Sequence, residues 1–392
     1  MKPADGASAC KVQVVDSVLN LYPSPSQVPA MPGLLDPFTL KSITLRNRIA
    51  VSPMCQYSSI DGMPNDWHFV HLGSRAVGGA GLVIVEASGV SPEGRISPGC
   101  SGIWSDAHVA EFAKITKFLK EHGAVPGMQI AHAGRKASAQ RPWEGDSHIQ
   151  VADGGWEILG PSAIAFGGNL TRVPKAMAKA DIALVTQQFV DAAMRTLAAG
   201  FEWLELHFAH GYLAHSFYSP LSNTRTDDYG GSFENRIRFL VETATAVRTV
   251  WPDHLPLTAR LSVEDYVVGG VTIDDSVELC KRLKACGVDL IDVSMGFNSP
   301  DVSGIPWAEG FLAPLAERIR REAGLSTAVG WLISDPHHAE SIVKAGQADV
   351  VMLARELLRD PYWPYHAAKA LEQDNPERLL PVQYARSAQR KR

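Results

Sequence analysis

The chain has few cysteines, no long apolar run and no excess of positive charge, and each shortage excludes a class of protein. Its 392 residues contain five cysteines, an odd number without a C-x-x-C pair, which argues against a disulfide framework or structural zinc. No apolar run is long enough for a membrane span, and the N-terminus lacks the basic-then-apolar order of a secretory signal. The net charge of −5 and scattered basic residues argue against nucleic-acid binding. We therefore expect a cytoplasmic protein with reduced thiols.

Glycine-rich nucleotide motifs are missing as well, since no G-x-G-x-x-G follows the first apolar segment and no Walker A motif is present. The chain has instead a repeated alternation of short apolar segments and segments of helical periodicity. Eight apolar segments are predicted strands: 48–52, 82–86, 125–131, 203–207, 257–261, 290–294, 327–330 and 350–353. Helical periodicity is clearest at 182–199, 233–250, 274–285, 311–322 and 337–345.

This alternation predicts the fold class. Buried parallel strands read as apolar runs, and eight strand–helix units over about 340 residues fit a closed (β/α)₈ TIM barrel of the α/β class. An open doubly wound sheet is the competing architecture, and the missing nucleotide motifs count against it. Helix starts are marked by Thr272 with Asp275, by Asp335 before Pro336, and by Asp360 before Pro361.

The predicted barrel occupies residues 34–371. Residues 1–33, which contain four prolines after position 22, are expected to be an N-terminal extension that is partly disordered. Residues 372–392 are expected to form a C-terminal tail.

The most informative segment is 206–213, where two imidazoles and a phenol, His207, His210 and Tyr212, directly follow a predicted strand. Imidazole N–H groups can hold an oxygen that becomes negative, and a phenol can give up a proton. A metal site is less favoured because no carboxylate or thiol stands at ligand spacing. A single histidine after a strand is more often structural, but three such groups at the carboxyl end of a barrel strand favour catalysis.

Further polar side chains are expected at the same end of the barrel, from Cys55, Tyr57, Gln129, Arg260 and Arg355. For two of these residues a purely structural role is the alternative to a functional one. Cys55 could pack as a small hydrophobe, and Arg260 could form a buried salt bridge with Asp292 on the next strand.

A phosphate site is predicted after the last two strands, at Gly330-Trp331 and Ala354-Arg355. Loops after these strands commonly bind phosphate in such barrels. Together with the amide of Gln129, which can donate to and accept from a flat heteroaromatic ring, this predicts a phosphorylated aromatic cofactor. FMN fits this site. Pyridoxal phosphate fits less well, because no lysine stands at a strand end.

Seven motifs follow one another along the chain: Asn47-Arg48-Ile49, Pro53-Met54-Cys55-Gln56-Tyr57, Val85-Glu86-Ala87, Gln129 to His132 with Gly134-Arg135-Lys136, His207-x-x-His210-Gly211-Tyr212-Leu213, Asp228 to Ser232 with Glu234-Asn235-Arg236, and Arg355 to Pro361. In these motifs the chain resembles the old yellow enzyme family of flavin-dependent ene-reductases, over about residues 34–386. The cysteine of the Pro53–Tyr57 motif resembles that of the thermophilic-like branch, which includes bacterial xenobiotic reductases.

The resemblance implies an NADPH-dependent FMN oxidoreductase that reduces the activated C=C bond of α,β-unsaturated carbonyl compounds. His207 and His210 would bind the carbonyl oxygen, Tyr212 would donate the proton, and Cys55 would tune the flavin and touch the substrate. The resemblance places FMN against Pro53, Met54, Cys55, Ala87, Gln129, Arg260, Gly330, Trp331, Ala354 and Arg355. It places the substrate also against Tyr57, Trp307, Trp363 and Arg386.

The resemblance further implies a homodimer or homotetramer, in which Arg386 could reach a neighbouring active site. The alternatives are a dienoyl-CoA-type reductase, which would need an iron–sulfur cluster and further domains, a flavin-binding scaffold without turnover, and a phosphosugar isomerase or aldolase on the same barrel.

Overall fold

A computed structural model describes residues 31–388 of the chain. Most of the expected extension, residues 1–30, and the end of the expected tail, residues 389–392, lie outside the described residues. The barrel and the functional residues belong to one compact unit that begins at Pro32.

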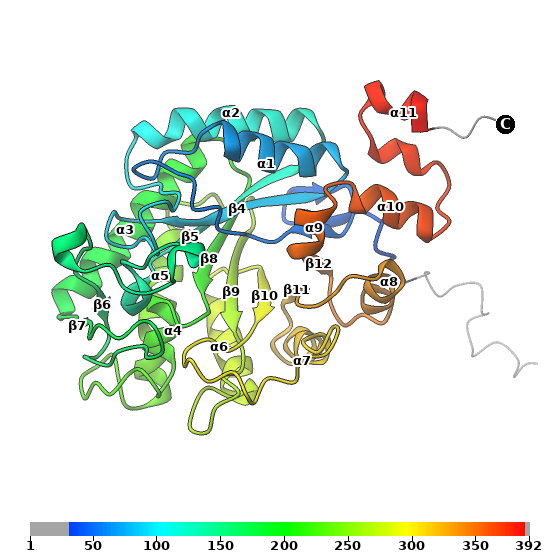
Figure 1. Ribbon diagram of the computed structural model, residues 1–392. Coiled ribbons are helices and arrows are strands. Elements are labelled where there is room, and N and C mark those ends of the chain that lie inside the picture. Colours follow the sequence, from blue (N-terminus) through cyan, green and yellow to red (C-terminus); the bar gives the residue numbers. More distant parts are fainter. Residues whose placement is uncertain (1–30, 389–392) are drawn as a thin grey trace, which may run out of the picture. The chain divides into compact units, whose positions relative to one another are not determined.

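Eight parallel strands close into a barrel, as predicted (Figure 1). They follow one another around the barrel in chain order, and the last pairs with the first. The strands are β3 (Ile49–Val51), β4 (Leu82–Gly89), β5 (Val125–Ala131), β8 (Trp203–Phe208), β9 (Leu257–Ser262), β10 (Leu290–Ser294), β11 (Ser326–Val329) and β12 (Val350–Leu353). Every residue of six of these strands is buried, because the helices cover their outer face and the packed barrel covers their inner face.

The helices alternate with the strands. The helices of the barrel are α1 (Asp66–Val77), α2 (Ala107–Glu121), α3 (Lys179–Ala198), α4 (Leu213–Tyr218), α5 (Phe233–Arg248), α6 (Ile273–Ala285), α7 (Ala313–Ala323), α8 (Pro336–Lys344), α9 (Arg355–Arg359) and α10 (Trp363–Ala370). They are followed by a short 3₁₀ turn, η5 (Pro376–Leu379), and by α11 (Val382–Ala388).

Two of the three predicted helix starts are confirmed. The Thr272 hydroxyl accepts the Asp275 N–H at the start of α6, and the Asp335 carboxylate accepts the His338 N–H at the start of α8. The third was wrong. Asp360 ends α9, and its carboxylate accepts the Tyr362 N–H in a turn before α10 begins at Trp363.

An antiparallel hairpin that the sequence analysis did not predict precedes the barrel, formed by β1 (Phe38–Leu40) and β2 (Ile43–Leu45). Phe38 and Leu45 pack in one buried cluster with residues near the first ends of barrel strands, among them Leu82, Trp203 and Leu290. The hairpin therefore covers the amino-terminal end of the barrel.

The connection from β5 to α3 is the longest of the barrel and starts at the opposite end. It contains three 3₁₀ turns, η2 (Gly134–Lys136), η3 (Pro142–Glu144) and η4 (Val151–Asp153), and a two-stranded sheet of β6 (Leu159–Gly160) and β7 (Lys175–Ala176). Residues of this connection form one side of a cavity at the barrel mouth.

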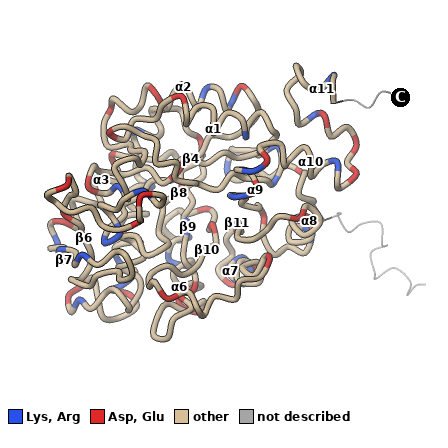
Figure 2. The backbone as a smooth tube through the Cα atoms, viewed as in Figure 1, with Lys and Arg blue, Asp and Glu red and all other residues tan. Residues whose placement is uncertain are grey.

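Charged residues of both signs are interspersed over the elements of the barrel (Figure 2). Within residues 31–388, no helix combines the length and the apolar character that a membrane span requires.

Candidate active site

The predicted imidazole and phenol groups meet at the carboxyl end of β8. His207 is the second-to-last residue of this strand and is buried, whereas His210 and Tyr212 follow it and are half-buried. The His207 ring centroid lies 5.2 Å from that of His210 and 5.0 Å from that of Tyr212, with both pairs nearly perpendicular. The three side chains therefore form one cluster, as expected from their spacing.

The backbone between these side chains takes a left-handed turn. His210 has φ +60° and Gly211 has φ +70°. A side chain at Gly211 would stand 2.2 Å from the Phe297 carbonyl oxygen, so glycine is required there. The turn at His210 is held from two sides, because its N–H donates to Ser262 Oγ at 2.9 Å and its carbonyl oxygen accepts from Lys136 Nζ at 2.9 Å.

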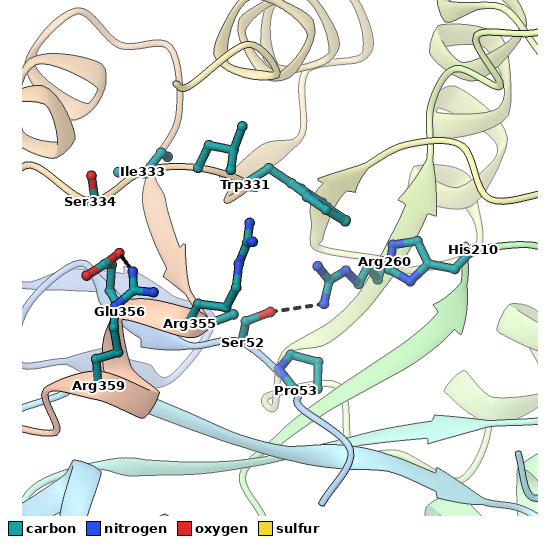
Figure 3. Close-up of a pocket in the computed structure, with 12 residues that line it drawn as sticks. Ser52, Pro53, His210, Arg260, Trp331, Ile333, Ser334, Arg355, Glu356 and Arg359 are labelled. Atoms are coloured by element: carbon teal, nitrogen blue, oxygen red, sulfur yellow. Dashed lines mark hydrogen bonds and ion pairs between the residues drawn. The ribbon is translucent and has the colours of Figure 1, made fainter. Parts of the chain in front are cut away.

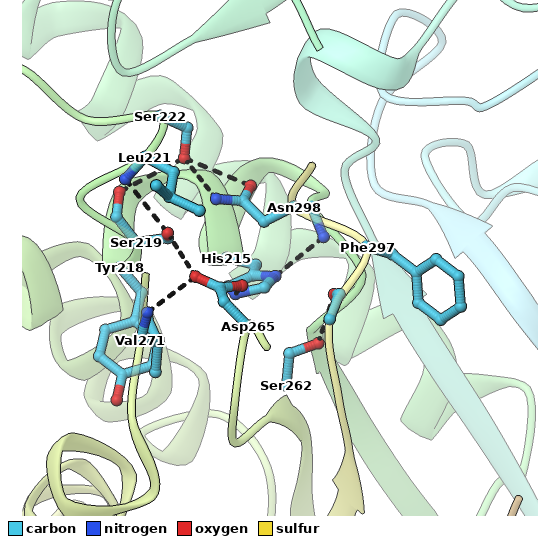
Figure 4. A network of polar contacts seen from close by, with 12 residues as sticks. His215, Tyr218, Ser219, Leu221, Ser222, Ser262, Asp265, Val271, Phe297 and Asn298 are labelled. Atoms are coloured by element: carbon cyan, nitrogen blue, oxygen red, sulfur yellow. Dashed lines mark hydrogen bonds and ion pairs between the residues drawn. The ribbon is translucent and has the colours of Figure 1, made fainter. Parts of the chain in front are cut away.

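A buried histidine and carboxylate hold the other half of this turn (Figure 4). The Gly211 N–H donates to His215 Nδ1 at 2.9 Å, so the His215 ring carries its proton on Nε2, which lies 3.1 Å from Asp265 Oδ1. That last contact is close but is not aligned as a hydrogen bond. The other carboxylate oxygen of Asp265 accepts from Ser219 Oγ and from the Val271 N–H.

Both site histidines are neutral. Burial, followed by the charges of Arg260 and Lys136, lowers the pKa of His207 well below its usual value, and burial and Arg260 do the same for His210. The Nδ1 of His207 is buried without a hydrogen-bond partner among the described residues, which leaves Nε2 as the nitrogen open to a ligand. His210 Nε2 lies 2.6 Å from Ser294 Oγ.

Tyr212 lies in a cavity of 410 Å³ that Tyr57, Phe166 and Phe297 also line. Burial raises the pKa of the Tyr212 phenol well above its usual value, so it keeps its proton at neutral pH. The ammonium group of Lys136 lies 5.1 Å from the centroid of the Tyr212 ring. Burial, and then the charge of Arg135, lowers the pKa of Lys136 to about 7.

Polar groups of neighbouring strands meet inside the barrel beneath this cluster. Arg260 Nε forms the ion pair with Asp292 that the sequence analysis named, at 3.2 Å, and Arg260 also donates to Ser52 Oγ at 3.0 Å. The Gln129 amide donates to Glu205 Oε1 at 2.9 Å, which leaves its own oxygen as an acceptor. Burial, and then the charge of Asp292, raises the pKa of Glu205 to about 8.

Cys55 is half-buried after β3 and lies next to a second thiol, that of Cys100. The contact with Cys100 and burial raise the pKa of Cys55 well above its usual value, so Cys55 is a neutral thiol.

A second cavity of 410 Å³ fits the predicted phosphate site (Figure 3). Pro53, Arg260, Trp331, Ala354 and Arg355 line it. The Arg355 side chain points into this cavity, and its guanidinium makes no ion pair within residues 31–388. An unpaired guanidinium in a cavity of this size suits a phosphate group, and the cavity size suits a cofactor.

The remaining predicted residues have different surroundings. Met54 packs partly against the core, and Ala87 is buried in β4. Gly330 follows β11, where a side chain would stand 2.7 Å from the Met352 carbonyl oxygen. Trp307 is 48% exposed, with its ring centroid 6.1 Å from that of Trp331.

Two predicted substrate contacts lie in elements at the end of the chain. Trp363 is buried at the start of α10, and its indole N–H donates to the Ser334 carbonyl oxygen, behind the wall of the second cavity. Arg386 is exposed on α11.

Five further residues of the site were not predicted from the sequence: Glu205, Ser262, Ser294, His215 and Asp265. Glu205 carried a signal, because it stands two residues before His207 and so faces the same side of β8. Ser262 and Ser294 had no such signal in the sequence, since a serine hydroxyl at a strand end can donate to or accept from many kinds of partner.

Comparisons with known proteins identify relatives of the chain. The sequence model of the NADH:flavin oxidoreductase / NADH oxidase family matches residues 33–374. An NADPH dehydrogenase of a Geobacillus species is 49% identical over 340 residues, which cover 86% of this chain and 94% of that protein.

Two solved structures are also similar. Morphinone reductase shares 26% identity with a TM-score of 0.74, and the match covers 88% of this chain and 90% of that one. A 2-naphthoyl-CoA reductase shares 25% identity with a TM-score of 0.78, and the match covers 89% of this chain. The chain spans about half the length of that reductase, 53%.

Proposed function

The chain belongs to the NADH:flavin oxidoreductase / NADH oxidase family, the family of the old yellow enzymes, and from this membership and its site we propose an NADPH-dependent ene-reductase. In this proposal it is an FMN enzyme that reduces the activated C=C bond of α,β-unsaturated carbonyl compounds. The observation that carries the proposal is the cluster of two neutral imidazoles and a protonated phenol beside a cavity.

His207 and His210 bind the carbonyl oxygen of the substrate. A neutral imidazole can donate one hydrogen bond, and donors fixed in a buried site stabilise negative charge that develops on an oxygen. Because neither ring is charged, each offers a single N–H to the substrate oxygen and keeps its second nitrogen as an acceptor. The polarised carbonyl makes the β-carbon electrophilic.

Tyr212 donates the proton to the α-carbon. Its raised pKa keeps the phenol protonated, and its ring lies against His207, so the donor stands beside the bound oxygen. In this proposal, Tyr57 and Cys55 also contact the substrate.

FMN would lie across the barrel mouth, with its phosphate at Arg355 and the backbone of Gly330 to Trp331, and its ring between Pro53, Gln129 and Arg260. The arginine-lined cavity and the free acceptor of Gln129 support this placement. Bound there, FMN would accept a hydride from NADPH and pass it to the alkene. One cavity then serves both NADPH and the alkene in turn, so no separate dinucleotide-binding domain is needed.

We place the enzyme in the cytoplasm as a homodimer or homotetramer, in line with the sequence analysis. The role of Arg386 at a neighbouring active site stays a prediction.

An anaerobic half-reaction experiment tests the proposed activity. The purified protein should be yellow, NADPH should bleach it, and 2-cyclohexenone should restore the colour with formation of cyclohexanone. Saturated cyclohexanone, as the control, should leave the reduced protein bleached. A protein that takes up no flavin, or that is bleached but not recoloured by the enone, contradicts the proposal.

A further inference from the structure

We infer that Ser294 is a positioning residue that sets which nitrogen of His210 carries the proton. Its hydroxyl donates to Nε2 of the neutral ring, so that Nδ1–H is the donor presented to the substrate oxygen. This inference rests on the proposed function for its consequence, but the position of the proton can be measured independently of turnover.

Among residues 31–388, the geometry around Ser294 leaves its hydroxyl proton one acceptor, Nε2 of His210. Ser294 is the last residue of β10 and is fully buried. Its Oγ lies 3.0 Å from Nε1 of Trp331 and 2.6 Å from Nε2 of His210. An indole N–H can only donate, so Ser294 Oγ accepts from Trp331 with one lone pair. The contact with His210 is then the one through which the serine can donate.

The neutrality of His210 makes the position of its single proton decisive. A neutral imidazole has one N–H and one acceptor nitrogen, and the partner of one nitrogen sets the role of the other. If Nε2 carried the proton, Ser294 would accept twice and its own buried proton would have no acceptor among residues 31–388. A buried donor without an acceptor is unfavourable. The arrangement with Ser294 donating satisfies both groups.

The consequence lies on the other side of the ring. With Nε2 engaged by Ser294, His210 presents Nδ1–H, and His207 offers Nε2, since its Nδ1 is buried; a substrate oxygen at Nε2 favours the tautomer with the proton there. The substrate oxygen thus meets two donors. If the His210 proton moved to Nε2, the unprotonated Nδ1 would face the substrate oxygen and repel it.

Ser294 in this role differs from a serine that only fills space. Trp331 and Ser294 come from the ends of β11 and β10, whereas His210 follows β8, so three segments meet at one hydroxyl. A packing role requires the volume of the side chain. The proposed role requires the hydroxyl proton, and a substitution that removes the hydroxyl alone tells the two apart.

The test uses the oxidised holoenzyme labelled with ¹⁵N histidine, and the His210 signals are assigned by their loss in His210→Asn. In the natural enzyme we expect the protonated nitrogen to be Nδ1. In Ser294→Ala we expect signal from the Nε2-protonated ring, an increase of KM for 2-cyclohexenone, and about tenfold slower recolouring by it, the loss that corresponds to one hydrogen bond. Bleaching by NADPH should change by less than about twofold.

Two further variants complete the design. Ser294→Thr keeps the hydroxyl and should restore the Nδ1 proton and most of the rate. Ser276→Ala removes another fully buried serine hydroxyl, on α6, and should leave the His210 signals unchanged.

The inference is overturned if natural His210 carries its proton on Nε2, or if Ser294→Ala keeps the Nδ1 proton and its enone kinetics. A natural enzyme that shows the Nδ1 proton but is never recoloured by the enone contradicts the proposed function and leaves the assignment of Ser294 standing.

Discussion

Single residues at this site owe their protonation to burial. His207, His210 and Tyr212 are all driven to their neutral forms, the histidines because burial disfavours a cation and the tyrosine because it disfavours an anion. None of the three should therefore titrate between pH 6.5 and 10, the ordinary pKa values of the two residue types. Two neighbouring groups have a pKa in that range, Lys136 at about 7 and Glu205 at about 8, and of these Lys136 is the one that lies against the Tyr212 ring.

Lys136 should consequently dominate the pH dependence of substrate reduction. Below pH 7 its ammonium lies near the histidines and Tyr212 and favours negative charge on the substrate oxygen. Above pH 7 this charge is lost, so recolouring by 2-cyclohexenone should slow by about threefold to tenfold as pH rises. Stopped-flow rates from about pH 6 to 9 measure this, and Lys136→Met should give a slower, flat profile. An unchanged inflection in Lys136→Met would assign it to another group.

The sequence alone predicted that His207, His210, Tyr212 and Arg260 lie together, because their positions in or just after strands are local properties of the chain. It could not identify Ser294, since its contact with His210 joins positions 84 residues apart and depends on how strand ends turn inward. The Arg260–Asp292 pair was predictable, because neighbouring strands bring a buried cation and a buried acid together.

Among the elements, the turn between β8 and α4 is the one that shapes the site. It places two consecutive residues in the left-handed region, and hydrogen bonds to Ser262, His215 and Lys136 hold it there. A non-glycine residue in that region costs about 1–3 kcal/mol, so His210 keeps this conformation only because the surroundings enforce it.

Removing one of these hydrogen bonds should weaken both the fold and the site. His215→Leu leaves the buried Gly211 N–H without an acceptor, which should lower the free energy of unfolding by about 1–3 kcal/mol in urea titrations. KM for 2-cyclohexenone should rise because the turn that carries His210 and Tyr212 loosens. His215→Asn offers an amide oxygen to the same N–H and should retain part of the stability. Equal losses in the two variants would mean that the Gly211 hydrogen bond is not what His215 contributes.

Several barrel strands could be predicted from the sequence because their burial is visible in it. The apolar segments 125–131, 290–294 and 350–353 match β5, β10 and β12 residue for residue, because strands buried on both faces are continuous apolar runs. The hairpin of β1 and β2 escaped prediction since three residues are too few to show a period. Its role at the closed end of the barrel becomes visible only from its packing against Trp203 and Leu290.

At the scale of the whole molecule, the two ends of the barrel differ: one end is closed by packing, and the other holds the cavities. The hairpin and the apolar cluster around it close one end, and both cavities lie at the other. The two cavities flank the His207–His210–Tyr212 cluster. His210 and Arg355 line the first cavity, and Tyr212 and Tyr57 line the second. We expect the cofactor in the first and the substrate above it, next to the second.

Cofactor binding should stabilise the whole barrel, by an amount that grows with the logarithm of the cofactor concentration divided by its Kd. At 100 times its Kd, FMN should add about 2.7 kcal/mol, which corresponds to several degrees in Tm. At the same concentration, riboflavin, which lacks the phosphate, should add less because its Kd is higher. Arg355→Ala should reduce the effect of FMN toward that of riboflavin, and Arg282→Ala on the outer surface of α6 should not. If FMN and riboflavin stabilise the natural apoprotein equally, the phosphate does not bind at Arg355.

The central claim is that His207 and His210 hold the substrate oxygen while Tyr212 gives the proton. The most direct measurement compares the two half-reactions of Tyr212→Phe under anaerobic conditions. We predict that bleaching by NADPH stays within about twofold of the natural rate, whereas recolouring by 2-cyclohexenone slows by about a hundredfold or more, the contribution of one proton donor. Equal slowing of both half-reactions, or of neither, would contradict the assignment of Tyr212.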